Sequence, residues 1–205
     1  MYKKIFARHL RKPDGFLGKI VALVMNRTND EMNLFAIHQL QIQPSDTIME
    51  IGFGNGKYFS HVLGQSSTGK LVGVDYSETM VNQVRKRYAD YIQQNRLEVI
   101  QGSVSRIDYG DNTLDKIYTV NTLYFWPNPT SDIQEIYRVL KNEGLLVIAF
   151  KSREGMEKSK FAPHGFTLYS VEEVIEIVKS AGFRQVSPIH APTKKTGIYC
   201  VTAVK

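Results

Sequence analysis

Residues 46–56 read DTIMEIGFGNG, and this stretch decides the fold. A run rich in β-forming residues, 47–49, leads through the acid Glu50 into glycines at every second position, Gly52, Gly54 and Gly56. Residues 57–63, which follow at once, are compatible with a helix. Glycine allows the positive φ angles that a tight turn needs and allows a ligand to approach the backbone closely. The stretch therefore predicts a strand, a bare turn and a helix start that together receive a ligand.

The glycine spacing separates several kinds of ligand turn. A dinucleotide fingerprint, G-x-G-x-x-G, would need glycine at position 57, which is Lys57, a residue expected to face solvent. A P-loop is excluded because no G-K-[ST] follows at the required spacing. The observed E-x-G-x-G-x-G resembles the first motif of class I S-adenosylmethionine-dependent methyltransferases. The resemblance implies that Glu50 and the three glycines lie at the methionine part of that cofactor; a glycine turn without a ligand is the alternative.

A second acid follows at the distance that a nucleoside site requires. Residues 70–75, KLVGVD, read as a short buried strand that ends in Asp75, and Ser77 begins a predicted helix over 77–94. Asp75 lies about twenty residues beyond the glycine turn, where an acid at the end of the second strand reaches ribose hydroxyls. A carboxylate can accept both hydrogen bonds of a vicinal diol. The alternative is an acid favoured by the helix dipole alone. By the resemblance, Tyr76 covers one face of the adenine.

Two further strand ends are candidate parts of the site, because ligands of open α/β sheets bind beyond the carboxyl ends of the strands. The third predicted strand, 97–101, is followed by Ser103 and Val104. Members of the family commonly carry an acid at the position of Ser103, where it accepts a hydrogen bond from the adenine amino group. Serine can still accept one, and the Val104 backbone can serve the ring. The adenine contact at Ser103 therefore departs from the family pattern.

The fourth predicted strand, 114–120, ends in an aromatic segment. Asn121, a further cofactor-binding candidate, precedes three adjacent aromatic residues, Tyr124, Phe125 and Trp126. Tyr and Trp have polar tips that need partners when they are buried. Two interpretations are open: a wall that faces the methyl acceptor, or an aromatic cap that packs beneath the loop.

The same segment can be compared with the (D/N)PPY motif of methyltransferases that act on amino groups of nucleic-acid bases. Asn121 and Tyr124 match this motif, but Thr122 and Leu123 replace both prolines. A run N-T-x-x-F/W is ordinary in the small-molecule branch, and the chain is more similar to that branch, which includes the type 11-like methyltransferases. The expected function is methyl transfer to a small molecule. An RNA-base methyltransferase and a non-catalytic S-adenosylmethionine-binding protein are the alternatives.

Catalytic residues are the least defined part of the expected site. A general base is needed only when the acceptor is a protonated hydroxyl, thiol or amine. The candidates are Tyr124 and His164, although a solvated histidine is the simpler interpretation of His164 in its polar loop. No metal is expected: near strands four and five only Asp115 and Asp132 lie close in sequence, and neither stands at the carboxyl end of a strand.

The chain alternates predicted strands and helices after a helical lead. Further strands are predicted at 144–150, 183–190 and 197–205, and further helices at 130–140 and 170–181. This alternation implies an α/β fold with a doubly wound, mostly parallel seven-stranded sheet. No helix separates the last two strands, so they are expected to form a C-terminal antiparallel hairpin, as in the Rossmann-like methyltransferase fold. Residues 1–43 are interpreted as an N-terminal helical lid and 44–205 as the cofactor-binding domain.

Composition and charge limit the expected cellular location and the expected binding partners. The 205 residues include one cysteine, Cys200, which excludes an internal disulfide and a C-x-x-C metal site. No apolar run reaches about eighteen residues and the N-terminus does not read as a signal peptide, so a cytoplasmic location is expected. The net charge is +6, and seven basic residues fall in the first 27 positions. That segment permits contact with nucleic acid or weak contact with an anionic membrane surface, while a small molecule is the expected partner.

Overall fold

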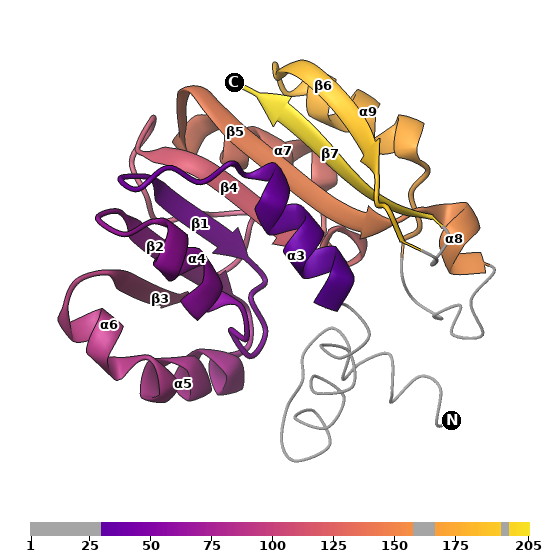
Figure 1. The fold of residues 1–205 in the computed structure, drawn as a ribbon. Helices are drawn as coiled ribbons and strands as arrows, with labels where there is room; N and C mark the ends of the chain where they lie inside the picture. Colours follow the sequence, from indigo (N-terminus) through magenta and orange to yellow (C-terminus); the bar gives the residue numbers. More distant parts are fainter. Residues whose placement is uncertain (1–29, 158–166, 194–196) are drawn as a thin grey trace.

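The computed structural model describes residues 30–157, 167–193 and 197–205. A seven-stranded sheet forms its centre (Figure 1), in the spatial order β3-β2-β1-β4-β5-β7-β6. The first five strands are parallel, and β7 is antiparallel to both of its neighbours, which confirms the predicted doubly wound sheet with a C-terminal hairpin. The strands are β1 Thr47–Ile51, β2 Lys70–Asp75, β3 Leu97–Gln101, β4 Leu114–Val120, β5 Leu140–Lys151, β6 Arg184–His190 and β7 Ile198–Val204.

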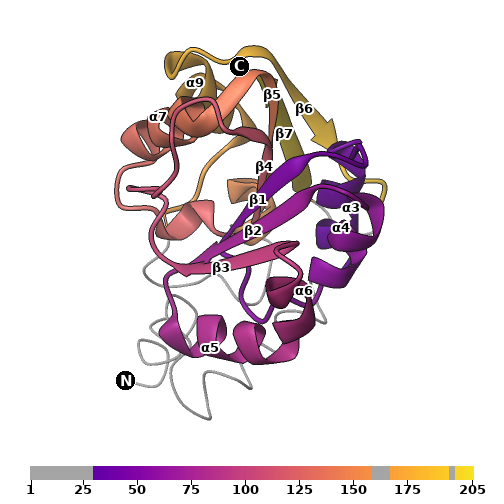
Figure 2. The same ribbon diagram turned by 90° about the vertical axis from the view of Figure 1, so that its left-hand side faces the viewer.

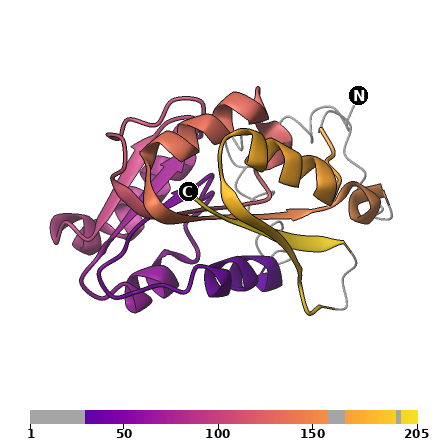
Figure 3. The same cartoon turned by 90° about the horizontal axis from the view of Figure 1, so that it is seen from above.

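Helices cover both faces of the sheet and give three layers (Figure 3). One face shares a hydrophobic core with α3, α4 and α5, and the other face shares a second core with α7 and α9. Figure 2 shows α5 and the short α6 beside β3, at one edge of the sheet. The helices are α3 Asp30–Gln39, α4 Phe59–Gln65, α5 Glu78–Arg87, α6 Ala89–Gln93, α7 Pro129–Val139, α8 Arg153–Glu157, α9 Val171–Ser180 and the 3₁₀ turn η1 Leu123–Phe125.

Local capping explains where the helices begin and end. The Ser77 hydroxyl accepts a hydrogen bond from the Met80 N–H at the start of α5. Ser170 and Glu173 form a reciprocal capping box at the start of α9, and Gly182 follows that helix with a φ of 102°. These side chains satisfy N–H groups that a helix start leaves unpaired, and glycine adopts the left-handed C-terminal conformation without steric cost. The helix ends predicted near these residues are confirmed.

The helix predicted over 77–94 and the strand predicted over 144–150 differ from the structure. The single helix expected over 77–94 is two helices, because Tyr88 leaves the helical conformation and directs its buried ring toward the glycine turn, where its hydroxyl donates to the Gly56 carbonyl at 2.8 Å. The fifth strand begins at Leu140, before the predicted 144–150. A register shift against β4, with Glu143 at a φ of 62°, adds these residues to the strand.

α3 lies within the predicted lid segment 1–43, and its apolar side packs directly on the sheet. One cation holds its C-terminal end. The Lys116 ammonium, on β4, donates to the carbonyls of Leu40 at 2.7 Å and Gln41 at 2.6 Å and pairs with Asp46 at 2.9 Å. The Lys116 and Asp46 side chains are only 12% and 11% exposed, so this ion pair is largely shielded from water. The division at residue 43 stays a prediction.

Removing the Lys116 charge tests whether this contact holds α3. We expect Lys116→Met to lower the free energy of unfolding by about 3 kcal/mol, because it leaves the Asp46 carboxylate and two carbonyls without their cation. Lys141→Met is the matched control, because Lys141 pairs with Asp115 at 2.7 Å but is 44% exposed, and it should cost less than about 1 kcal/mol. Denaturant unfolding measures both values. Equal losses in the two variants would contradict this assignment.

Candidate active site

Among the described residues, the glycine turn is crowded at Gly52 and open at Gly54. Gly52, Gly54 and Gly56 have φ angles of 75°, 58° and 63°, a region that L side chains adopt only under strain. A Cβ atom at Gly52 would clash with the Thr122 side chain, whereas one at Gly54 would meet no atom of the described residues within 4 Å. The turn is therefore packed at Gly52 and open above Gly54, where a ligand can reach the backbone.

α4 begins at Phe59, two residues later than predicted, so the glycine turn does not run directly into a helix. The intervening residues are held by side chains. The Lys57 N–H donates to Asn55 Oδ1 at 3.0 Å, and the Arg87 guanidinium donates to the Asn55 carbonyl at 3.0 Å. Lys57 is exposed, as expected, but its ammonium pairs with Asp30 on α3. The turn thus has contacts with α5 and with α3.

Asp75 ends β2 directly beside this turn. Its Oδ2 accepts the Gly54 N–H at 2.7 Å, and its Oδ1 accepts the Ser77 N–H at 2.8 Å. Desolvation raises the pKa of Asp75 to about 6, although these two hydrogen bonds act in the opposite direction. Each carboxylate oxygen keeps a lone pair after accepting one N–H. Asp75 can therefore bind a diol while it holds the turn, as the ribose prediction requires.

Glu50 brings a second carboxylate to the same end of the sheet. Its side chain is 5% exposed, and one carboxylate oxygen accepts a hydrogen bond from the Tyr118 hydroxyl on β4. Burial raises the pKa of Glu50 to about 7, and the negative charge of Asp75 adds to the rise. Two carboxylates with raised pKa values make this end of the sheet favourable for a ligand that carries positive charge.

The end of β4 lies against the glycine turn. The Thr119 hydroxyl donates to the Ile51 carbonyl at 2.8 Å and also shares a hydrogen bond with the Thr122 hydroxyl. Asn121 has a φ of 58°, a left-handed conformation that Asn tolerates better than most residues. These contacts bring Asn121 and the aromatic segment that follows it next to the predicted cofactor-binding residues.

The three aromatic side chains do not share one environment. Tyr124 and Trp126 are 5% and 8% exposed and belong to the hydrophobic core, whereas Phe125 is half-buried and packs against that core. The Tyr124 and Phe125 rings meet edge to face, with centroids 6.3 Å apart. Burial of Tyr124 and Trp126 fits the aromatic-cap interpretation, which leaves Phe125 as the most accessible of the three. Their role toward an acceptor stays a prediction.

The Tyr124 hydroxyl has backbone partners. It accepts the Lys151 N–H at 2.6 Å, and it lies 3.0 Å from the Lys151 carbonyl and 3.3 Å from Asn121 Oδ1. Burial raises the pKa of Tyr124 well above its ordinary value. A phenol with a raised pKa forms the tyrosinate less readily, which disfavours Tyr124 as a general base at neutral pH. His164, the other predicted base, lies outside the described residues.

The residues predicted to contact the adenine differ in how accessible their side chains are. Tyr76 is 62% exposed beside Asp75, so its ring is accessible to a ligand. The Ser103 hydroxyl accepts the Ser105 N–H at 3.3 Å within its own turn. Val104 is buried in the core.

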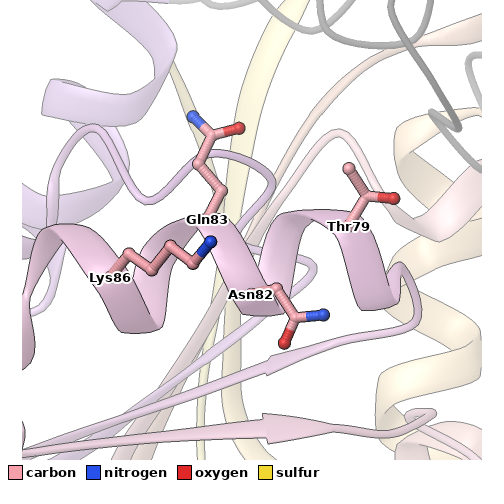
Figure 4. A pocket seen from close by; sticks show the side chains of 4 residues that line it. All are labelled: Thr79, Asn82, Gln83 and Lys86. Carbon is pink, nitrogen blue, oxygen red and sulfur yellow. The ribbon is translucent and has the colours of Figure 1, made fainter.

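A separate hollow lies along α5 and is lined by four polar side chains (Figure 4), Thr79, Asn82, Gln83 and Lys86, none of which was predicted as a site residue.

Sequence reasoning missed three residues that shape the site, Tyr118, Tyr88 and Asp30. Tyr118 is the direct neighbour of Glu50 in the β1–β4 register, and a tyrosine inside a buried strand signals a polar partner. Tyr88 lies within a predicted helix, where no local signal indicated a break.

In the part of the chain that the structure describes, no group of three or more His, Cys, Asp or Glu side chains is arranged to hold a metal ion.

Comparison with known proteins identifies the family. Residues 49–148 match the family described as a methyltransferase domain. The Bacillus subtilis protein named uncharacterized methyltransferase YdaC is 30% identical over 189 residues, which cover 91% of this chain and 98% of that protein. The chain is a class I S-adenosylmethionine-dependent methyltransferase.

One relative with a named activity and one solved structure extend the comparison of this methyltransferase. A demethylmenaquinone methyltransferase from Oceanobacillus iheyensis is 29% identical over 112 residues, which cover 53% of this chain and 46% of that protein. The crystal structure of a SAM-dependent methyltransferase from Aquifex aeolicus superposes with a TM-score of 0.72 at 23% identity, covering 86% of this chain and 92% of that chain. The second similarity shows the shared fold.

The family and the fold imply S-adenosylmethionine as the cofactor of this methyltransferase, and the residues at the turn fit it. The open side at Gly54 leaves space for a ligand against the backbone. Asp75 offers acceptors for a ribose diol, and the carboxylates of Glu50 and Asp75 suit a cofactor with a positive charge. The predicted role of each residue in cofactor binding is open to direct test.

Asp75→Ala tests the ribose assignment. We expect the variant to lose at least about tenfold in affinity for S-adenosylmethionine, because it loses both the ligand acceptor and the acceptor of the Gly54 N–H. Asp108→Ala is the matched control, since Asp108 is exposed in the loop before β4 and its affinity should equal that of the wild type. Titration calorimetry measures both. Unchanged binding by Asp75→Ala would remove Asp75 from the cofactor site.

The raised pKa of Glu50 makes a prediction about stability and pH. Glu50 titrates near 7 when folded and near 4.5 when unfolded, so between these values the folded protein binds more protons than the unfolded chain. Stability contributed by the protonated group is therefore lost as pH rises through this window. Relative to Glu50→Gln, which keeps an acceptor for Tyr118, the wild type should lose about 3 kcal/mol of unfolding free energy from pH 4.5 to 7.5. Denaturant melts at several pH values measure the difference; parallel curves would refute it.

Proposed function

We propose that this methyltransferase transfers a methyl group from S-adenosylmethionine to a small molecule with an aromatic or lipid-like body. The observation that carries the proposal is the packing of Thr122 against Gly52. It brings the end of β4 beside the turn predicted to hold the cofactor, and Phe125 follows Thr122 three residues later. An acceptor that enters past the end of β4 would lie next to the open side of the turn at Gly54.

The chemistry asks little of the protein beyond orientation. S-adenosylmethionine supplies, when bound, a methyl group already activated by its sulfonium. Glu50, Asp75 and the glycine backbone would hold the donor side, and residues 121–126 would orient the acceptor. Alignment of two bound reactants can lower the barrier by about 7–11 kcal/mol in favourable cases. The proposal therefore names no general base, and the proton that methylation displaces from the acceptor passes to water.

The class of acceptor is supported by one relative and by the aromatic segment. The Oceanobacillus iheyensis relative is named for demethylmenaquinone as its substrate, and we extend a quinone-type acceptor to this chain as part of the proposal. An aromatic side chain such as Phe125 can pack against the ring of such an acceptor. The atom that receives the methyl group follows from the acceptor: a quinol offers ring carbon and hydroxyl oxygen, and N-methylation would require another aromatic or lipid-like acceptor.

The charge of the chain supports a proposal about where this reaction takes place. Residues 1–29 contain seven Lys and Arg and one Asp, so their net charge equals the +6 of the whole chain. We propose that this segment brings a cytoplasmic enzyme to the anionic surface of a membrane, where lipid-like acceptors reside. Nucleic acid is the other anionic partner that the charge permits. Among the described residues, no helix is long and apolar enough to cross a membrane.

Transfer of labelled methyl groups tests the acceptor class. The wild type would be incubated with labelled S-adenosylmethionine and, separately, with a demethylated quinol in anionic phospholipid vesicles, with polar metabolites and with RNA. We expect label in the quinol fraction, and much less label with Asp75→Ala when the cofactor concentration lies below the Kd of that variant. Label confined to polar metabolites would overturn the aromatic or lipid-like class, and label confined to RNA would overturn the small-molecule proposal. Absence of label from all three would favour a protein that binds the cofactor without turnover.

A further inference from the structure

We propose that Asp30 is a positioning residue for the cofactor: it holds the chain just after the glycine turn in place from α3. The inference goes beyond the acceptor proposal, because it concerns cofactor binding alone. It rests on a contact between the first residue of α3 and two consecutive residues beyond Gly56. No part of the expected site included Asp30.

The Asp30 carboxylate contacts two neighbouring side chains at once. Both of its oxygens lie 2.8 Å from the Lys57 ammonium, and Oδ1 accepts the Tyr58 hydroxyl at 2.5 Å. The Lys57 ammonium also lies 5.3 Å from the centre of the Tyr58 ring. Desolvation, together with the hydrogen bond to Asp30, raises the pKa of Tyr58 and keeps its hydroxyl a donor. One carboxylate thus fixes the direction of two consecutive side chains.

These two residues are close to the cofactor turn along the backbone. The Lys57 N–H donates to the Asn55 side chain, and the Asn55 and Gly56 carbonyls accept from Arg87 and Tyr88. The segment 55–58 is therefore held by the C-terminal end of α5 and by the N-terminal end of α3. If the α3 contact is lost, this segment keeps its contacts with α5 but loses a restraint on its other side.

Asp30 belongs to a helix, α3, that is held in place by contacts at both of its ends and along its buried side. Lys116 holds the carbonyls at the opposite end of α3, and the helix buries Met32, Ala36 and Ile37 against the sheet. The neighbouring Glu31 accepts the Thr193 hydroxyl at 2.6 Å, which links the same helix turn to the segment after β6. A carboxylate on such a support can define where Lys57 and Tyr58 lie. A side chain on a free loop could not do so.

Loss of the Asp30–Lys57 ion pair is expected to affect cofactor affinity more than the stability of the folded protein. Asp30 and Lys57 are 42% and 41% exposed, and ion pairs at this exposure contribute little to global stability. Cofactor affinity depends on the geometry of the turn that the pair restrains. Loss of the pair should therefore reduce cofactor affinity while the unfolding of the cofactor-free protein hardly changes.

The experiment compares Asp30→Asn with the wild type in the full chain. We expect the Kd for S-adenosylmethionine to rise about fivefold by calorimetry, while the thermal midpoint without cofactor stays within about 3 °C. Glu143→Gln is the matched control: it breaks the exposed Arg184–Glu143 pair, 2.7 Å long and 62% and 73% exposed, on the far edge of the sheet. Its Kd should equal that of the wild type.

A double-mutant cycle then tests the partner. If Asp30 acts through Lys57, Asp30→Asn combined with Lys57→Met should bind the cofactor no more weakly than the weaker single variant. Additive losses would overturn the pairing, and an unchanged Kd for Asp30→Asn would overturn the positioning role. A fall in thermal midpoint beyond about 3 °C with unchanged Kd would make the contact structural only. Because no acceptor is present, these results stand apart from the identity of the substrate.

Discussion

The Asp75 carboxylate is the point at which the cofactor turn, the second strand and the following helix meet. Its two oxygens accept one backbone N–H from the turn, at Gly54, and one from the start of α5, at Ser77. Removing a carboxylate from water is costly unless such donors replace the solvent. The donors do not compensate fully, since the pKa of Asp75 remains raised to about 6. The site therefore gains most from a ligand that adds further donors or positive charge.

Helices on one face of the sheet supply the remaining restraints on the turn. Tyr88 lies where the helix after β2 is interrupted and its hydroxyl donates to the Gly56 carbonyl, while Asp30 contacts the residues after Gly56 from α3. Between them the glycines keep their left-handed conformations with an open side at Gly54. A turn made of glycine has no side chains to hold its own shape, so neighbouring elements must do so. This explains why polar contacts gather around a segment that itself carries few side chains.

The parts of the structure that could be predicted from sequence are those with local signals. The glycine pattern, the acid that ends β2 and the missing helix before β7 each follow from a short stretch of chain, and they contribute to the predicted doubly wound sheet with its C-terminal hairpin. The contacts that complete the site join distant residues: Tyr118 is 68 positions from Glu50, and Lys57 is 27 from Asp30. Hydrophobic periodicity carries no information about such pairs. For the same reason, the sequence could not separate the two interpretations of the aromatic segment, whereas the structure shows Tyr124 in the core.

The position of Tyr124 also bears on the kind of acceptor. Its hydroxyl accepts the Lys151 N–H and therefore ties the end of β4 to the end of β5, directly beside Asn121. A group that holds two strand ends together and has a raised pKa is poorly suited to remove a proton during the reaction. Methyl transfer past this residue would then favour an acceptor that supplies its own electron pair, such as an electron-rich ring whose displaced proton passes to water. Quinols have this property, which connects the chemistry of the strand ends with the proposed acceptor class.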